Sequence, residues 1–255
     1  MSSLKLYNEV TAKSSKYTTL LYSSSFSSAI GLLHKDLRQP IYDIYGFVRF
    51  ADEIVDTFHE FDKASLFTQF KKDTYLALEQ GISLNPILHR FQLTYSKYKI
   101  DPALLEAFLV SMEMDLNKQQ YDVATYQTYI YGSAEVVGLM CLKVFVNGDD
   151  YKYDELKDAA MRLGSAFQKV NFLRDLKDDN LLLSRNYFPD FDLNSFDENA
   201  KKKIIAEIED DFKVAHQGIL KLPKEAQFGV YTAFVYYKKL LNKLEKTPCH
   251  KIGTT

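Results

Sequence analysis

The chain has 255 residues, of which 46% are hydrophobic, and its formal charge is −2 at pH 7. This length and composition allow a substantial core, and the near-neutral charge gives no indication of nucleic-acid binding. The two cysteines, Cys141 and Cys249, are far apart and form no CxxC pair. A disulfide framework or zinc site is therefore not expected, and a reducing cytoplasmic location fits this cysteine usage.

Neither export nor membrane insertion is expected from the apolar stretches of the chain. Residues 1–17 contain no apolar run of the kind that a signal peptide carries. The longest apolar candidate, Val136 to Val146, includes Lys143 and is shorter than the roughly 18 residues that a membrane span needs.

Helical spacing of apolar residues dominates the chain, which has only 10 Gly and 6 Pro. We expect Pro40, Pro86 and Pro102 each to open a helix, Asp101 to cap one, and Gly148 to separate two long helices. With no internal repeat or linker, a single all-α domain over residues 1–255 is the economical interpretation. The expected helices are 16–33, 40–58, 63–80, 86–97, 102–117, 124–146, 152–182, 197–220 and 224–246.

An acidic pair stands on the second expected helix. Asp52 and Asp56 are four residues apart, so they project from one helix face, and Arg49 precedes them on the same face. Two like charges at this spacing repel each other by a few tenths of a kcal/mol in an isolated helix. The pair therefore predicts a positively charged partner.

A second cluster repeats this spacing near the end of the expected helix 152–182. Asp175 and Asp179 are again four residues apart, with Arg174 beside them. Gln168 and Asn171 share a face with Asp175, although the surrounding residues are apolar. A polar stripe in apolar surroundings must find partners.

The two clusters together predict a metal site. Mg²⁺ prefers hard oxygen ligands and is usually held by one or two carboxylates, substrate phosphates and water. Asp52, Asp56, Asp175 and Asp179 are the candidate ligands, for Mg²⁺ or alternatively Mn²⁺, and an arginine beside each pair suits a diphosphate. The alternative is that each cluster is an exposed helix face with ordinary salt bridges. The matching spacing favours the metal site.

Other chemistries have little support in this sequence. It contains no GxGxxG, P-loop, GxSxG or HExxH motif, and its five histidines show no ligand spacing. The content of 18 Tyr and 18 Phe fits either a ring-packed core or an apolar tunnel lined by aromatic faces, and both can hold.

Three segments resemble one known family. The runs from Tyr22 to Asp56 and from Leu163 to Pro189 are similar to the two signatures of the squalene/phytoene synthases, and the segment 112–140 resembles the central helices of that family. The resemblance spans roughly residues 20 to 245 and implies an isoprenoid-synthase-type helical bundle around a central cavity. The DExxD form of Asp52 to Asp56 is most like bacterial phytoene synthases.

What the resemblance implies is a Mg²⁺-dependent head-to-head coupling of two geranylgeranyl diphosphates. A cyclopropylcarbinyl (prephytoene) diphosphate forms first and rearranges to phytoene, and no NADPH is expected. A squalene or dehydrosqualene synthase that uses farnesyl diphosphate is the nearest alternative. A non-catalytic helical scaffold or assembly factor is an alternative of another class, and a single-substrate terpene cyclase is a further one.

The resemblance also carries over individual positions. Tyr131 matches a tyrosine near the reacting centre, with the four aspartates and Arg174 as the other expected catalytic residues. For the serines and tyrosines among the matched residues, a purely structural role stays open. The serines could simply start a helix, and the tyrosines could lie in the core. The expected substrate-binding residues are Ser23, Ser25, Phe26, Tyr45, Arg49, Gln168, Asn171, Arg185, Tyr187 and Tyr237.

The chain departs from the family pattern in two places. Glu135 stands where the family usually has Gly, so it faces either a basic group of a neighbouring helix or the site itself. The family usually continues with a short basic segment beyond the point where this sequence stops, and we expect diphosphate binding to suffer without it. Phe26, Ile30 and Phe167 are candidates for limiting the isoprenoid tail, but their sizes do not separate a fifteen-carbon from a twenty-carbon donor.

The partners expected from this chemistry are prenyl diphosphates and a membrane that receives the hydrocarbon product. We therefore expect peripheral contact at the inner face of the membrane, although no amphipathic anchor stands out in the sequence. The sequence gives no indication of oligomeric state.

Overall fold

The computed structural model describes residues 3–116, 123–178 and 197–252, and every element within these ranges is helical. The prediction of an all-α fold is therefore confirmed, whereas the assignment of residues 1–255 to one domain stays a prediction. The elements are α1 (Ser3–Tyr22), α2 (Ser24–Gly31), α3 (Lys35–Asp56), α4 (Lys63–Gln80), α5 (Pro86–Tyr98), α6 (Pro102–Leu116), α7 (Val123–Ile130), the π-helical turn η1 (Tyr131–Glu135), α8 (Val136–Phe145), α9 (Asp150–Asp178), α10 (Glu198–Lys221), α11 (Lys224–Lys246) and the 3-10 turn η4 (Cys249–Lys251).

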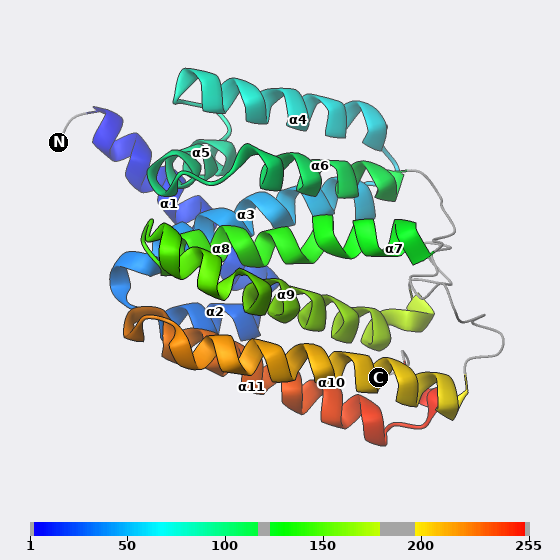
Figure 1. The fold of residues 1–255 in the computed structure, drawn as a ribbon. Helices are drawn as coiled ribbons and strands as arrows, with labels where there is room; N and C mark the ends of the chain where they lie inside the picture. Colours follow the sequence, from blue (N-terminus) through cyan, green and yellow to red (C-terminus); the bar gives the residue numbers. More distant parts are fainter. Residues whose placement is uncertain (1–2, 117–122, 179–196, 253–255) are drawn as a thin grey trace.

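The helices are arranged so that the two aspartate-bearing helices lie inside the bundle. In Figure 1, α4 forms one edge, α10 and α11 form the opposite edge, and α3, α8 and α9 lie between them. Helix α9 packs on α8, α10 and α11, and α3 packs on α1, α4, α5, α6 and α8. This arrangement places α3 and α9 on either side of the centre of the molecule.

Several helix boundaries differ from the prediction, and the expected helix 124–146 contains the π-helical turn η1. The expected helix 16–33 is interrupted at Ser23, whose extended backbone (φ −148°) and side chain cap the start of α2. Helix α3 begins at Lys35 after the N-cap His34, so Pro40 lies inside the helix and does not open it. A proline in the second turn costs one backbone hydrogen bond, and the packing of this long, largely buried helix tolerates that loss.

Other boundaries follow the predicted turn chemistry. The Asn85 side chain accepts hydrogen bonds from the backbone N–H groups of Ile87 (3.0 Å) and Leu88 (3.3 Å) at the start of α5. Asp101 caps α6 through the backbone N–H of Ala103 at 2.9 Å. These caps satisfy donors that have no partner within the helix, which explains why helices begin at Pro86 and Pro102.

Helix α1 begins at Ser3, well before the expected start at residue 16. This part of the helix was not predicted because its buried face is polar. Its buried residues are Thr11, Ser15 and Thr19, four residues apart along one side. These small side chains let α1 approach α3 closely, and a Cβ added to Gly46 would lie 3.6 Å from the Cα of Ser15. A search for apolar periodicity does not detect such a face.

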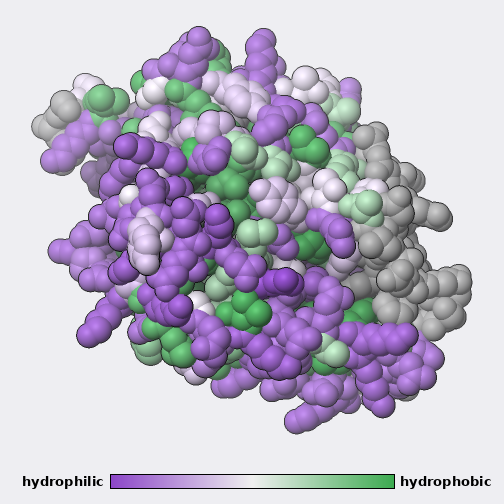
Figure 2. Space-filling model, viewed as in Figure 1, coloured by the Kyte–Doolittle hydropathy of each residue, from purple (hydrophilic) through white to green (hydrophobic). Residues whose placement is uncertain are grey.

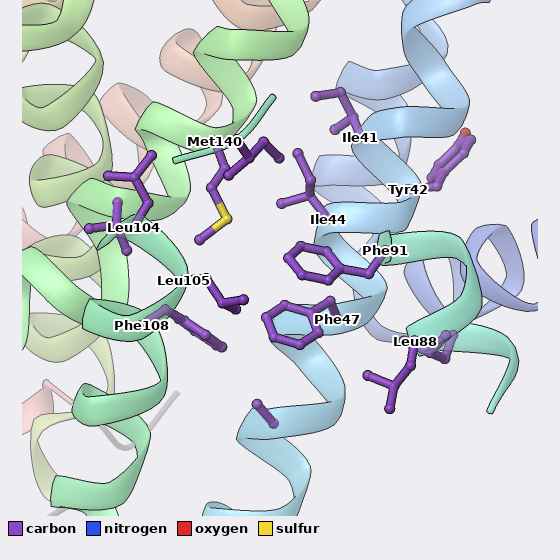
Figure 3. Close-up of a cluster of buried hydrophobic side chains, with 14 of the residues drawn as sticks. Ile41, Tyr42, Ile44, Phe47, Leu88, Phe91, Leu104, Leu105, Phe108 and Met140 are labelled. Atoms are coloured by element: carbon purple, nitrogen blue, oxygen red, sulfur yellow. The ribbon is translucent and has the colours of Figure 1, made fainter. Parts of the chain in front are cut away.

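An aromatic cluster forms the core between α3, α5 and α6. The ring of Phe47 is fully buried and stacks on Phe91, with ring centroids 3.8 Å apart and an interplanar angle of 11°. Phe70 also stacks on Phe47 at 5.5 Å, and Phe108 lies 5.4 Å from Phe47 with its ring tilted by 51°. Figure 3 shows Phe47, Phe91 and Phe108 among aliphatic side chains. A second apolar cluster joins α9, α10 and α11.

Backbones meet where α9 crosses η1 and α8. A Cβ added to Gly164 would lie 2.5 Å from the carbonyl oxygen of Ala134, and one added to Gly138 would lie 2.6 Å from the carbonyl oxygen of Ala160. Both glycines also line the central cavity. Glycine is needed at both positions because any side chain would push the two helices apart.

We expect Phe47→Ala to lower the free energy of unfolding by about 3–5 kcal/mol, since it removes a fully buried ring from a cluster of four. Urea denaturation measures this loss. The control is Leu84→Ala at a residue that is 97% exposed, for which a change within about 0.5 kcal/mol is expected. Equal losses in the two variants would contradict the assignment of the cluster as the core.

Candidate active site

A cavity of about 630 Å³ lies between the two apolar clusters. Residues of α2, α3, α6, α7, η1, α8, α9, α10 and α11 line it, together with Tyr22 at the end of α1. One part of its wall carries carboxylates, arginines and hydroxyl groups, and the other part is aliphatic. The cavity therefore suits a ligand with an anionic head and a long apolar tail.

Helix α3 provides one acidic side of the cavity. Asp52 and Asp56 both line it, as predicted from their spacing, and Asp115 of α6 joins them. Burial raises the pKa of Asp52 well above its ordinary value, and the charges of Asp56, Asp115 and Glu53 act in the same direction. Three carboxylates at one end of a cavity form a place where a cation is favoured.

Arg49 lies beside these carboxylates with one donor unused. Its guanidinium pairs with Glu53 and lies over the ring of Tyr22, 4.4 Å from the ring centroid. The buried Nε of Arg49 has no hydrogen-bond partner. Because an unpaired buried donor is costly, this nitrogen is suited to an anionic oxygen of a ligand.

Helix α9 provides the facing side. Gln168, Asn171, Arg174 and Asp175 all line the cavity, so the predicted polar stripe is brought to one place. Arg174 donates from Nε to Asp175 Oδ1 at 2.7 Å and from Nη2 to Oδ2 at 2.5 Å. Arg174 thus contacts both oxygens of Asp175 at the cavity wall.

Three predicted residues fall outside the described part of the chain. Asp179 follows directly after α9, and Arg185 and Tyr187 lie in the segment between α9 and α10. Their predicted roles as a metal ligand and as substrate-binding residues therefore stay predictions.

Four aromatic rings form a cluster beside the polar end of the cavity. Phe26 contacts Tyr45, Phe167 and Tyr237 at centroid distances of 6.0, 6.0 and 5.8 Å, and Phe167 stacks on Tyr237 at 4.0 Å. All four rings line the cavity. Burial raises the pKa of Tyr237 to about 12, so its hydroxyl stays protonated. A neutral group of ring faces can stabilise a carbocation without reacting with it.

Ser23 and Ser25 reach the cavity from the start of α2. Ser23 Oγ accepts from the backbone N–H of Phe26 at 3.1 Å and lies 3.3 Å from Ser25 Oγ. Both serines line the cavity, so the capping role and a ligand-binding role coexist at Ser23.

The structure does not bring Tyr131 to the cavity, where it was expected. Tyr131 is 36% exposed and is absent from the cavity wall, which contains Tyr129 instead. In an uninterrupted α-helix, Tyr131 would share a face with Ala134 and Gly138. The π-helical turn η1 adds one residue to this turn, which rotates the preceding segment by about 100° and brings Tyr129 inward.

Asp115 and Tyr129 are the site residues that the sequence reasoning missed. Tyr129 donates its hydroxyl proton to Asp115 Oδ2 at 2.7 Å, and both residues are buried. The available signal was the position of Asp115 on the largely apolar face of helix α6, since a carboxylate in such surroundings must find a partner. Tyr22 and Tyr236 also line the cavity without having been predicted.

Glu135, the departure from the family pattern, does not line the cavity. Burial raises the pKa of its carboxyl, and the nearby charge of Lys169 opposes that shift. Lys169 itself donates to Asp211 at 2.8 Å, and Arg162 donates to the other oxygen of Asp211 at 2.9 Å. Glu135 therefore faces basic groups of the neighbouring helix α9 and not the cavity, which is one of the two orientations that the sequence left open.

The apolar part of the cavity is closed by aliphatic and small residues. Phe26, Ile30 and Phe167 line it as expected of candidates for limiting the tail. Beyond them the wall continues to Leu142, Phe145, Leu156, Ile219 and Leu222. The apolar space thus extends well past the three residues that the sequence suggested.

No group of three or more His, Cys, Asp or Glu side chains among the described residues is close enough to hold a metal ion by itself. Within the same residues, no helix is long and apolar enough to cross a membrane.

Comparison with known proteins decides the family. The family model described as squalene/phytoene synthase matches residues 21–254 of the chain. The chain belongs to the squalene/phytoene synthase family.

Relatives in this family are similar over most of the chain. Phytoene synthase 1, chloroplastic, of Solanum lycopersicum is 27% identical over 246 residues, which are 88% of this chain and 58% of that protein. The chain thus spans less than two thirds of that relative. The 15-cis-phytoene synthase of Pantoea ananas is 26% identical over 253 residues, covering 90% of this chain and 81% of that one. The presqualene diphosphate synthase of Rhodopseudomonas palustris is 28% identical over 172 residues, 65% of this chain and 58% of that protein.

Solved structures of other members share the fold. A dehydrosqualene synthase in complex with a ligand has a TM-score of 0.79 and 18% identity, with 94% of this chain and 87% of that chain covered. A squalene synthase from Alicyclobacillus acidocaldarius has a TM-score of 0.80 at 18% identity, with 94% and 95% covered. This confirms the expected isoprenoid-synthase-type helical fold.

The raised pKa of Asp52 has a consequence for the metal-free protein. A carboxyl that holds its proton more tightly when folded makes the free energy of unfolding fall as pH rises from about 3.9 through the raised pKa. We therefore expect metal-free Asp52→Asn to melt a few degrees above the wild type at pH 7, and the difference to vanish below about pH 4.

Thermal unfolding in the presence of a chelator measures this effect. Asp154→Asn, at an exposed residue outside the cavity, is the control and is expected to melt with the wild type at both pH values. An Asp52→Asn protein that is no more stable than the wild type at pH 7 would contradict the expected cost of the buried charge.

Proposed function

We propose that the chain is a Mg²⁺-dependent phytoene synthase, which couples two geranylgeranyl diphosphates head to head and releases diphosphate. One observation carries the proposal: carboxylates of two facing helices, Asp52 and Asp56 of α3 and Asp175 of α9, line the polar end of a cavity that continues as an apolar space. That combination suits a substrate whose anionic head is removed while its hydrocarbon tail stays in a dry environment.

The residues present fit a metal-bridged diphosphate. Asp52 and Asp56 would hold Mg²⁺ on one side and Asp175 on the other, and Mn²⁺ is the alternative ion with the same preference for oxygen ligands. The negative charges around Asp52 support this fit, because burial and the charges of Asp56 and Asp115 raise the pKa of its carboxyl against the opposing charge of Arg49. When bound, the ion would neutralise charge on the departing diphosphate.

Two arginines would bind and orient the diphosphate. Arg49 has its unpaired Nε at the cavity wall, and Arg174 would turn from Asp175 to a phosphate oxygen. Guanidinium groups bind such oxygens through fixed, paired donors, and this geometry directs the leaving group toward the acidic end. The reacting carbon is then left facing the aromatic cluster.

The rings of Phe26, Tyr45, Phe167 and Tyr237 would stabilise the allylic cation after diphosphate leaves. Each ring face stabilises a nearby cation by about 0.5–2 kcal/mol. The aliphatic wall excludes water, which would otherwise capture the cation. The second substrate is alkylated to the cyclopropyl intermediate, and loss of its diphosphate, rearrangement and proton loss give phytoene.

Tyr129 and Asp115 are suited to a proton or charge role in the later steps. Their hydrogen bond of 2.7 Å lies at the cavity wall, and the acid is close enough to Asp52 to raise its pKa. We assign to Tyr129 the role that the family resemblance had suggested for Tyr131.

The choice of the twenty-carbon donor rests on the relatives named as phytoene synthases. A squalene or dehydrosqualene synthase that uses farnesyl diphosphate is the second candidate, since the similar solved structures carry those names. Squalene formation needs a reductant, whereas phytoene formation does not. NADPH dependence therefore separates squalene from phytoene.

A product assay tests the proposal. The chain is incubated with Mg²⁺ and either geranylgeranyl or farnesyl diphosphate, with and without NADPH, and hydrocarbons are identified by mass spectrometry. Phytoene from the twenty-carbon donor without NADPH is expected. A thirty-carbon product would overturn the substrate and keep the coupling, a cyclic product from one donor would indicate a terpene cyclase, and no product would favour a non-catalytic scaffold.

We expect Asp52→Ala and Asp175→Ala each to lower turnover at least about a hundredfold without loss of fold, since each removes a ligand that stabilises the departing diphosphate. Turnover and circular dichroism are measured together. Asp154→Ala is the matched control, because this exposed aspartate pairs with Lys157 outside the cavity. Near-normal turnover in either cavity variant would remove that residue from the metal site.

The two tyrosines flanking Ile130 form a matched pair. We expect Tyr129→Phe to slow the second half-reaction roughly tenfold, because the hydrogen bond to Asp115 is lost, whereas Tyr131→Phe leaves both half-reactions unchanged. Accumulation of the cyclopropyl intermediate in single-turnover experiments measures this. The reverse pattern would show that Tyr131 is the functional tyrosine.

A further inference from the structure

Helix α1 has its polar residues buried and its apolar residues outside. The side chains of Thr11, Ser15 and Thr19 are fully buried against the bundle. The opposite side of the helix carries an apolar stripe whose members recur mostly three, four or seven residues apart. The stripe consists of Leu6 (56% exposed), Val10 (53%), Tyr17 (59%), Leu20 (43%) and Leu21 (83%).

The attachment of α1 to the bundle does not use this stripe. The helix is held by small side chains packed near Gly46 and by polar contacts on its inner side. Asn8 Oδ1 lies 2.8 Å from His89 Nε2, and Gln39 donates to the carbonyl oxygen of Ala12 at 3.1 Å. The apolar stripe is thus left exposed on a helix that is already fixed, which is typical of a contact surface.

The charges of α1 differ from those of the whole chain. Three lysines, Lys5, Lys13 and Lys16, and one acid, Glu9, give the helix a formal charge of +2, against −2 for the full sequence. All four residues are exposed. A helix with an apolar stripe bordered by lysines is typical of segments that lie in the interface of an anionic bilayer.

The stripe ends next to a residue of the cavity wall. Tyr22 directly follows Leu20 and Leu21, lines the cavity and lies under the guanidinium of Arg49. At its other end, α1 projects from the bundle (Figure 1), and Figure 2 shows hydrophobic residues, coloured green, among hydrophilic ones there. A flat surface that touched the stripe would therefore also lie close to Tyr22 at the cavity wall.

We propose that the α1 stripe is the surface through which the protein docks on an anionic lipid bilayer. The need for such docking rests on the proposed function, because a hydrocarbon product has to be transferred from the cavity to an apolar phase. A second copy of the chain is a poorer occupant, since pairing two α1 helices would bring six lysines together with only two acids. A bilayer with anionic headgroups offers the missing negative charge.

Co-sedimentation with vesicles tests the docking surface. The whole protein is mixed at low salt with vesicles of phosphatidylcholine containing phosphatidylglycerol, or of phosphatidylcholine alone. We expect sedimentation with the anionic vesicles, weakening as salt rises. The double variant Leu6→Glu with Tyr17→Glu should bind at least about tenfold more weakly than the wild type, because two apolar side chains are lost from the contact.

The matched control carries the same charge change elsewhere. Leu220→Glu with Tyr151→Glu replaces two residues that are 54% and 82% exposed on α10 and α9 and that do not line the cavity. This control should sediment nearly as the wild type does, and all variants should share its thermal midpoint. Lys13→Glu with Lys16→Glu should weaken binding to anionic vesicles specifically.

Three outcomes would overturn the proposal. They are failure of the wild type to sediment with anionic vesicles, an equal loss in the control pair, and a dimer of the wild type that becomes monomeric in the stripe variant without vesicle binding. The sedimentation readout needs no turnover, so the docking surface stands or falls separately from the chemistry. In detergent solution, the stripe variant should turn over prenyl diphosphates at the wild-type rate if the proposed function holds.

Discussion

The grouping of negative charge at one end of the cavity is the constraint on which the rest of the structure depends. Asp52, Asp56 and Asp115 approach one another where water is scarce, and the raised pKa of Asp52 records the cost. Like charges held in such an environment destabilise the fold unless partners of opposite charge offset them. The charge of Arg49 opposes this rise in the pKa of Asp52 only in part, since Arg49 is also paired with Glu53 one turn away. Arg174 is paired with its neighbour Asp175.

Holding these charges apart from water requires a rigid frame on both sides. The aromatic stack around Phe47 fixes α3 against α5 and α6, and the buried ion pairs of Asp211 with Lys169 and Arg162 fix α9 against α10. Between these two supports the helices do not collapse on each other, and the space that remains is the cavity. The apolar wall and the acidic end are therefore products of the same packing, in which each half of the bundle is stabilised separately.

The sequence predicted those features that have a strong local period. The spacing of Asp52 and Asp56 and of Gln168, Asn171 and Asp175 placed these residues on one face each, and the structure brings both faces to the cavity. Most of α1 escaped detection because its buried face is made of Thr and Ser, and the α1–α2 break depends on the cap at Ser23. The contact of Asp115 with Tyr129 joins two helices, and no local pattern contains it.

The π-helical turn η1 ties the orientation of the segment before it to the length of the chain. Tyr129 and Ala134, five residues apart, line the same cavity, as do Val137 and Gly138 after the turn. Such a turn holds one more residue than regular α-helical winding does. Loss of a single residue from η1 would restore an ordinary helix, yet it would rotate Tyr129 by about 100° relative to α8. In an alignment with relatives, a one-residue gap at this point would therefore mark a change in the cavity wall, even where every named side chain is conserved.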